Sequence, residues 1–594
     1  MPRLRSAGSA LIRFVAFFAL TTFPGSIPSR LCAQTATANP AATKAYDSAL
    51  SAIRAGDFAT AESELEQAIK LSPANAEMQL TLGKVLLHLG DVDGAVSHLR
   101  ASIKLKPGDA QAHFYLGQAL SFSGKSEDAI VELKEASKLA PKDAEPHRAL
   151  ARAWNAQHKN AEAIVEAQKA AALAPNSAAT HDELGSLLAQ AGQLPEAEQQ
   201  FRSALQLDAQ YQPARFHLGV VRLNQGDGAG AQTELIAATK MNPQDGLAFY
   251  YLGAACQVTG DKDGAIAAYQ QAAELLPDSP MVQTKLGQLL QRTTDVEGAA
   301  AAFRKVVALT PNDADAHNNL GLVLMQRGEG DEAVKEFQEA VKLRPDDAGF
   351  RGNLGISQMQ LANFDAAIEE LKKAIAMSPN DASLHYDLGL ALKLKDNLTD
   401  GIAEMKKAVQ LDPKLVDAYY TLGNTMWQEG EFPAAVEYLR KAIALKPDYV
   451  EAYYTLGTVL KQMNQLPESA QALREAIRLQ PQLAGAHTTL AAVLRQMGDT
   501  SGAETESQLG DTLVKQKIGV QGATFATNSG KRMLTAGDLD GAISQFRSAI
   551  KMSPTYPQAH YQLAIALSRK GDKTAASDEF KQAQELDPRL KPIP

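Results

Sequence analysis

The chain has 594 residues, which is enough for several domains or for one long repeat array. Hydrophobic residues make up 45% of it and aromatic residues only 6%, and the abundance of Ala and Leu favours helix over sheet. The net charge of -9 argues against the basic surface that nucleic-acid binding requires, so we expect no nucleic-acid partner.

Residues 1–33 differ from the rest of the chain and predict a secretory signal peptide. They carry four arginines and no acidic residue, and the apolar run FVAFFAL (residues 14–20) follows the third arginine. Such a run is too short to span a bilayer as a mature anchor. We therefore expect cleavage after Ala33, a mature protein in the periplasm or outside the cell, and no stable membrane span. The alternative is an uncleaved N-terminal anchor.

From residue 42 onward the sequence repeats with a period of 34 residues. Within the period at 314–347, apolar residues recur at helical spacing in two runs, which RGEGDE separates and Pro345 ends. Each period therefore predicts a helix, a short turn and a second helix. Prolines mark the period through most of the chain, at Pro73, Pro107, Pro141, Pro175, Pro243, Pro277, Pro311, Pro345, Pro379, Pro413, Pro447 and Pro481.

Glycine, proline and aspartate occupy positions that suit helix ends. Pro195, Pro433 and Pro467 fall where the second helix begins, and a proline there loses no hydrogen bond. Gly321 either allows two helices to approach closely or caps a helix. The turns GDVDGA, GDKDGA and GDLDGA (residues 90–95, 260–265 and 537–542) resemble the start of a calcium loop. Helical residues follow where further oxygen ligands are needed, so we expect the aspartates to cap the second helix.

This pattern resembles the tetratricopeptide repeat (TPR). One period carries the family's residues in order: Leu320, Gly321, Leu324, Ala333, Phe337, Ala340 and Pro345. The resemblance implies an all-α fold, a right-handed superhelical solenoid of antiparallel helix pairs, with about 16 repeats. The expected segments are a disordered linker (34–41), about fourteen repeats (42–517), a phase break or hinge (518–522) and two repeats (523–594). Residues 506–525 depart from the pattern and predict either an extended helix or a hinge.

Histidine recurs at one position of the repeat, which raises the possibility of a metal or catalytic site. Other repeats place Phe or Tyr at this position, so the pattern indicates a ring packed between helices. Stacked helices lie about 8–10 Å apart, so one histidine per repeat does not converge on a metal ion. We expect no metal, no cofactor and no catalytic residue, and we expect Cys256 to be a small buried hydrophobe. The histidines are His113, His147, His181, His317, His385, His487 and His560.

The resemblance implies that the first helix of each repeat lines a concave groove. In the eleventh to fourteenth repeats, the groove positions combine aromatic and cationic side chains, which are residue types that anchor interfaces. We predict that this stretch binds a protein or an extended peptide, one that carries carboxylates. The predicted binding residues are Tyr386, Lys393, Tyr420, Asn424, Trp427, Tyr454, Lys461 and Arg495.

The sequence thus predicts a non-catalytic scaffold or adaptor for proteins or peptides in an exported compartment, and it leaves the oligomeric state open. One alternative is an assembly factor of the cell envelope for secretion, pili or polysaccharide export. Another is a non-catalytic relative of the TPR arm of O-linked N-acetylglucosamine transferases. Those enzymes need a large sugar-nucleotide domain after the repeats, which we do not expect in a sequence that stops at Pro594.

Overall fold

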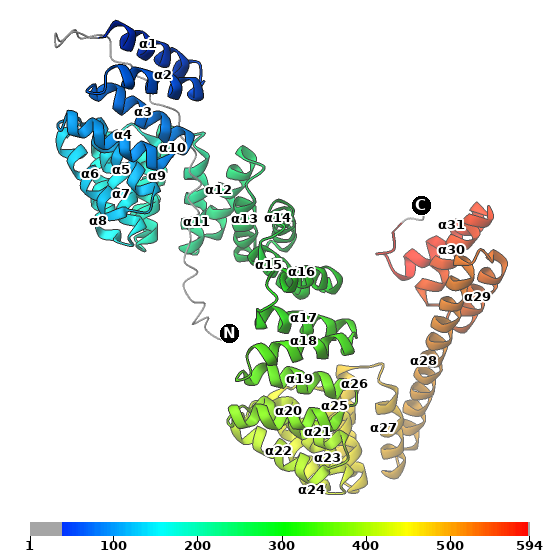
Figure 1. Ribbon diagram of the computed structural model, residues 1–594. Coiled ribbons are helices and arrows are strands. Elements are labelled where there is room, and N and C mark those ends of the chain that lie inside the picture. The colour runs from blue at the N-terminus through cyan, green and yellow to red at the C-terminus, as the bar shows by residue number, and fades with distance from the viewer. Residues whose placement is uncertain (1–38, 592–594) are drawn as a thin grey trace. The chain divides into compact units, whose positions relative to one another are not determined.

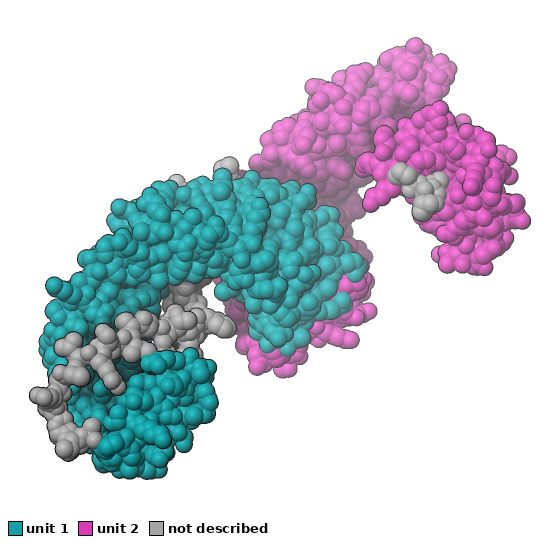
Figure 2. Space-filling view, turned by 90° about the horizontal axis from the view of Figure 1, so that it is seen from above, with its two compact units in different colours: residues 1–310 teal, residues 311–594 magenta. Residues whose placement is uncertain are grey.

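The structure is a computed structural model that describes residues 39–591, and the chain divides into two compact units, Met1–Thr310 and Pro311–Pro594 (Figure 2). The predicted signal peptide (1–33) and most of the predicted linker (34–41) lie outside the described residues. The described part is all-α, and none of its helices has the length and apolar character needed to cross a membrane.

Unit 1 is a series of helices arranged in antiparallel pairs (Figure 1). Its helices are α1 (Pro40–Arg54), α2 (Phe58–Leu71), α3 (Ala76–Leu89), α4 (Val92–Leu105), α5 (Ala110–Phe122), α6 (Ser126–Leu139), α7 (Ala144–Ala156), α8 (Asn160–Leu173), α9 (Ala178–Gln190), α10 (Leu194–Leu207), α11 (Gln212–Asn224), α12 (Gly228–Met241), α13 (Gly246–Thr259), α14 (Lys262–Leu275), α15 (Pro280–Arg292) and α16 (Val296–Leu309).

Unit 2 continues the pattern. Its helices are α17 (Ala314–Arg327), α18 (Gly330–Leu343), α19 (Ala348–Gln360), α20 (Phe364–Met377), α21 (Ala382–Leu394), α22 (Leu398–Leu411), α23 (Val416–Gln428), α24 (Phe432–Leu445), α25 (Val450–Gln462), α26 (Leu466–Leu479), α27 (Ala484–Gln496), α28 (Thr500–Thr535), α29 (Leu539–Met552), α30 (Pro557–Lys570) and α31 (Lys573–Leu586).

The pair α17–α18 shows why the repeat residues form this structure. Leu320 and Phe337 are buried between the two helices, and a Cβ placed on Gly321 would lie 2.8 Å from the Phe337 ring. Gly321 therefore permits close approach inside α17, while the left-handed cap of α17 is Gly328, with φ of 78°. Pro195, Pro433 and Pro467 lie at the starts of α10, α24 and α26, as predicted.

The first helices of successive pairs lie closer together than the second helices. In unit 1, α3 contacts α5 and α9 contacts α11, and in unit 2, α17 contacts α19 and α23 contacts α25. Contacts between second helices of successive pairs are fewer among the described residues. Each unit therefore curves toward its first helices, and we call the side that they form the inner face.

The long helix α28 contains both the atypical segment 506–525 and the predicted phase break 518–522. Its first part packs against α27 and its later part against α29, so α28 serves as the second helix of one pair and the first helix of the next. The thirty-one helices within residues 39–591 thus form sixteen antiparallel pairs. The absence of proline from residues 500–535 is one reason why the helix continues through the break.

Candidate functional site

The seven repeated histidines all lie at one position on the first helix of a pair, which we call the histidine slot. In six of them Nδ1 lies 2.5–2.6 Å from a glutamate oxygen on the second helix, nineteen residues later in the chain. In five of these six, Nε2 lies 2.9–3.1 Å from the carbonyl oxygen of the proline six residues earlier. The pairs are His113–Glu132, His147–Glu166, His317–Glu336, His385–Glu404, His487–Glu506 and His560–Glu579.

Other residues at the histidine slot follow the same rule. Arg351 donates to Glu370 and to the carbonyl oxygen of Pro345, so it repeats both contacts. Where the slot holds Tyr453, the position nineteen residues later is Ala472, which needs no donor. In these repeats an acid faces the donor and alanine faces Tyr453, whereas elsewhere Tyr419 faces the ring of Tyr438 and His181 lies in hydrogen-bond contact with Gln200. The predicted packing role agrees with the burial of these histidines, but it missed the hydrogen bonds, which the nineteen-residue spacing to Glu would have indicated.

The acidic turns cap helices, as predicted. Asp91 and Asp261 accept hydrogen bonds from the backbone N–H groups of Gly94 and Gly264, at 3.0 and 2.9 Å. Asp538 does the same at the start of α29. Over residues 39–591, no group of three or more His, Cys, Asp or Glu side chains is placed to hold a metal ion.

Cys256 is buried in α13, as predicted, with 2% of its surface exposed. Burial, and then the charge of Asp261, raises the pKa of its thiol to about 11. The Sγ atom also accepts a hydrogen bond from Nε2 of Gln232, at 3.4 Å. The thiol therefore stays protonated at neutral pH and is a poor nucleophile.

The structure places the eight predicted binding residues on four successive first helices of unit 2, α21, α23, α25 and α27. The aromatic ones are half-buried and held from one side. The Tyr386 hydroxyl lies 3.2 Å from Oγ1 of Thr421, and Nε1 of Trp427 donates to Gln462 at 2.6 Å. The Tyr420 ring centroid lies 4.9 Å from that of Tyr449. These contacts fix the rings, so each presents its remaining exposed surface in a set direction.

Of the polar members of the predicted set, only Arg495 is more exposed than the aromatic rings. Arg495 is exposed, and Asn424 and Lys461 are partly exposed. Lys393 is partly buried, and this burial lowers the pKa of its ammonium group. The eight residues therefore form an extended row across successive helices, and such a row suits an extended chain better than a compact small molecule.

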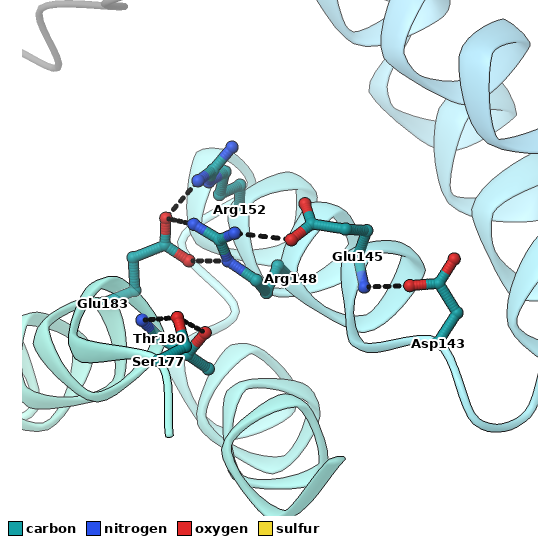
Figure 3. Close-up of polar contacts among 7 residues, drawn as sticks. All are labelled: Asp143, Glu145, Arg148, Arg152, Ser177, Thr180 and Glu183. Atoms are coloured by element: carbon teal, nitrogen blue, oxygen red, sulfur yellow. Dashed lines mark hydrogen bonds and ion pairs between the residues drawn. The ribbon is translucent and has the colours of Figure 1, made fainter. Parts of the chain in front are cut away.

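An ion-pair cluster on the inner face of unit 1 was not predicted. Arg148 of α7 donates from Nε and Nη2 to both carboxylate oxygens of Glu183 on α9, at 2.9 and 2.7 Å, and Nη1 donates to Glu145 at 2.6 Å. Figure 3 shows Arg152 reaching the same carboxylate. Both carboxylate oxygens of Glu183 are thus already paired within the chain. The cluster joins one first helix to the next.

Arg148 and Glu183 belong to a general pattern, in which a side chain on one first helix contacts the residue thirty-five positions later on the next first helix. We call each such pair a rung. Hydrogen-bonded rungs have distances of 2.6–3.2 Å, and one rung is a pair of aromatic rings with centroids 5.6 Å apart. The rungs are Tyr46–Thr81, Arg148–Glu183, Asp182–His217, Phe216–Tyr251, Asn318–Asn353, Tyr386–Thr421 and Trp427–Gln462.

Family models match the chain in series. Three models described as tetratricopeptide repeat and one described as TPR repeat together match more than half of it. A comparison with curated proteins finds no match. The first tetratricopeptide repeat model matches residues 46–110, 216–280 and 284–348, and the second matches 89–153, 324–393 and 533–590. The third matches residues 382–415 and 450–483, and the TPR repeat model matches 427–464.

Solved structures that resemble the chain include three at low sequence identity. A tetratricopeptide repeat protein from Parabacteroides merdae is 16% identical with a TM-score of 0.36, and the match covers 42% of this chain and 98% of that chain. Yeast Tom70 is 16% identical with a TM-score of 0.32, and the match covers 80% of this chain and 96% of that chain. The APC/C hetero-tetramer Cut9–Hcn1 gives 14% identity and a TM-score of 0.36, covering 77% and 97%. All three TM-scores are below 0.5.

Proposed function

The chain belongs to the tetratricopeptide repeat family, and from this premise we propose that it is a non-catalytic scaffold that binds an extended peptide or protein segment on the inner face of unit 2. TPR arrays are generally binding scaffolds, which supports the proposal. The observation that carries it is the row of half-buried aromatic rings, Tyr386, Tyr420, Trp427 and Tyr454, on three successive first helices.

The side chains of this row are of the types that contribute most to binding at protein interfaces. Half-buried Tyr and Trp rings lose little conformational entropy on binding, because their neighbours already hold them. Lys393 and Lys461 lie on two of the same helices and Arg495 on the next first helix, α27, and these cations supply charge for acidic residues of the bound segment. An extended segment would meet one or two of these side chains at each repeat.

The test begins with peptides selected from a random-peptide display library on the full chain. We expect the triple variant Tyr420→Ala, Trp427→Ala, Tyr454→Ala to lose binding. Tyr438→Ala, which removes a ring of similar exposure from the second helix α24, should retain it. Because Tyr420 and Trp427 also pack against the core, a second variant, Lys461→Glu with Arg495→Glu, changes only charge on the surface. Unchanged binding by both inner-face variants, with helical content intact, would overturn the proposal.

We also propose that the protein works outside the cytoplasm. The support is the arginine-containing, acid-free N-terminus with its short apolar run, and residues 1–33 lie outside the described residues. Mass spectrometry of the exported protein should find a mature chain that starts at Gln34. An intact N-terminus in the cytoplasmic fraction would contradict export.

A further inference from the structure

The later part of α28 carries a phenylalanine at a position that is buried in the other first helices from α3 onward. Phe525 lies five residues before Gly530, which approaches the Phe546 ring as the glycines of other first helices approach their second helices. Phe525 is 79% exposed, whereas the residues at the same position of α17, α19 and α21 are 3%, 5% and 6% exposed. Those residues are Ala316, Phe350 and Leu384.

The position is buried elsewhere because the second helix of the preceding pair covers it. Phe350 of α19 shares a core cluster with Ala340 of α18, and Leu384 of α21 shares one with Ala374 of α20. At α28 the first part of the same helix serves as the preceding second helix, and it continues along the same axis instead of lying over the later part (Figure 1). Within residues 39–591, Phe525 therefore lacks the cover that its counterparts have.

The exposed side of α28 extends from Phe525 in both directions. We call it the α28 face, and it consists of Asp511, Val514, Ile518, Phe525 and Arg532, all of which are exposed, with Ile518 at 62%. Four of the five are spaced by seven residues, which keeps side chains on the side of a helix that packs lengthwise against another helix. The face runs about 32 Å along the helix axis. It is acidic at its first end, apolar in the middle and basic at its last end.

We propose that the α28 face binds the α28 face of a second copy of this chain, with the two helices antiparallel. A two-fold axis that passes between residues 521 and 522 sets Ile518 of each copy on Phe525 of the other. The same axis sets Asp511 of each copy opposite Arg532 of the other. Each contact then occurs twice, as a two-fold interface requires. A parallel arrangement would set like charges against each other at both ends of the face, so the charges favour the antiparallel order.

This dimer adds to the proposed function without depending on it. The row of aromatic rings lies on α21, α23 and α25, and the α28 face lies on a later helix of unit 2. Dimerisation supplies the missing cover over Phe525 and joins two inner faces in one assembly. Two bound segments would thereby be held together.

Sedimentation velocity of the full chain at micromolar concentration tests the dimer. We expect the wild type to sediment as a dimer, and the double variant Ile518→Glu, Phe525→Glu to raise the dissociation constant of the dimer by about a hundredfold or more. Its helical content should not change, because both side chains are exposed. The control is Val131→Glu with Val165→Glu, which places the same charges at valines that are 64% and 48% exposed on α6 and α8, and it should remain a dimer.

Charge reversal tests the antiparallel order. Asp511→Lys should weaken the dimer by about tenfold or more, because it sets a lysine against Arg532 of the second copy. Adding Arg532→Glu should restore the dimer, because the pair then forms with its signs exchanged. A double variant as weak as Asp511→Lys would overturn the arrangement. A wild-type chain that stays monomeric, or that uses Phe525 to bind anionic lipid vesicles or the selected peptides instead, would overturn the inference and leave the proposed function standing.

Discussion

The histidine slot gives the sharpest stability prediction. In α17, His317 bridges Glu336 of α18 and the carbonyl oxygen of Pro311, at 2.6 and 3.0 Å. The change His317→Phe removes both hydrogen bonds and leaves the Glu336 carboxylate, which is 25% exposed, without its donor. A hydrogen bond to a charged group contributes about 1.5–3 kcal/mol, and Pro311 is exposed so that water can replace its donor. We therefore expect His317→Phe to destabilise the pair α17–α18 by about 2–3 kcal/mol.

A second substitution, Glu336→Ala, should restore most of the stability that His317→Phe loses. The double variant His317→Phe, Glu336→Ala recreates the combination of aromatic ring and alanine that the chain itself uses at Tyr453 and Ala472. Replacing both polar partners by apolar groups is nearly neutral, so the double variant should lie within about 1 kcal/mol of wild type. The coupling between the two sites is then about 1–3 kcal/mol.

Hydrogen exchange measured by mass spectrometry is the assay, because stability in a repeat array is local and a single unfolding transition does not describe it. The expected loss corresponds to about 30- to 150-fold faster exchange in α17 and α18 for His317→Phe, with near-normal exchange in the double variant. The reverse pair is the control: Tyr453→His alone should weaken α25, and adding Ala472→Glu should restore it. A double variant that exchanges as fast as His317→Phe would refute the reasoning.

The remaining predictions concern Asp387, Cys256 and Arg148. Burial, and then the charge of Asp381, raises the pKa of Asp387 from 3.8 to about 6, so the folded chain holds this proton more tightly than the unfolded chain, and the free energy of unfolding falls as pH rises from about 4 to 6. Asp387→Asn should remove that loss, so that at pH 8 the amides of α21 exchange about 30- to 150-fold more slowly than in wild type, which corresponds to about 2–3 kcal/mol; equal exchange at pH 8 would contradict the raised pKa of Asp387. In a Cys32→Ser background, Cys256 should react slowly with Ellman's reagent at pH 8 and quickly in urea, and fast reaction of the folded chain would contradict its burial. Arg148→Ala should speed hydrogen exchange in α7 and α9 by about tenfold or more because it leaves Glu183 poorly paired, and Arg148→Lys should have a smaller effect; equal exchange in both would argue against the bidentate pair.

The helical pairs could be predicted because the local signals agree with one another. Around Gly321, the apolar spacing, the left-handed cap at Gly328 and the proline at 345 all indicate the same two helices, and the structure has them as α17 and α18. The segment around α28 lacks proline and has weak periodicity, so the sequence left both a hinge and an extended helix open.

The polar contacts between helices were harder to predict, because each depends on two residues that are distant in the chain. His317 looked like a ring that packs, and only Glu336, nineteen residues later, shows that it also donates. The positions of the predicted binding residues on successive first helices could be inferred from the repeat, but their mutual contacts could not.

The most direct test of the central claim is photo-crosslinking of a selected peptide that carries a benzophenone group, with the attachment sites mapped by mass spectrometry. The proposed scaffold predicts attachment to the first helices α21, α23 and α25, near Tyr386, Asn424 and Tyr454, and loss of attachment in the triple aromatic variant. Attachment to the second helices α22, α24 and α26, or to unit 1 alone, would contradict binding on the inner face of unit 2.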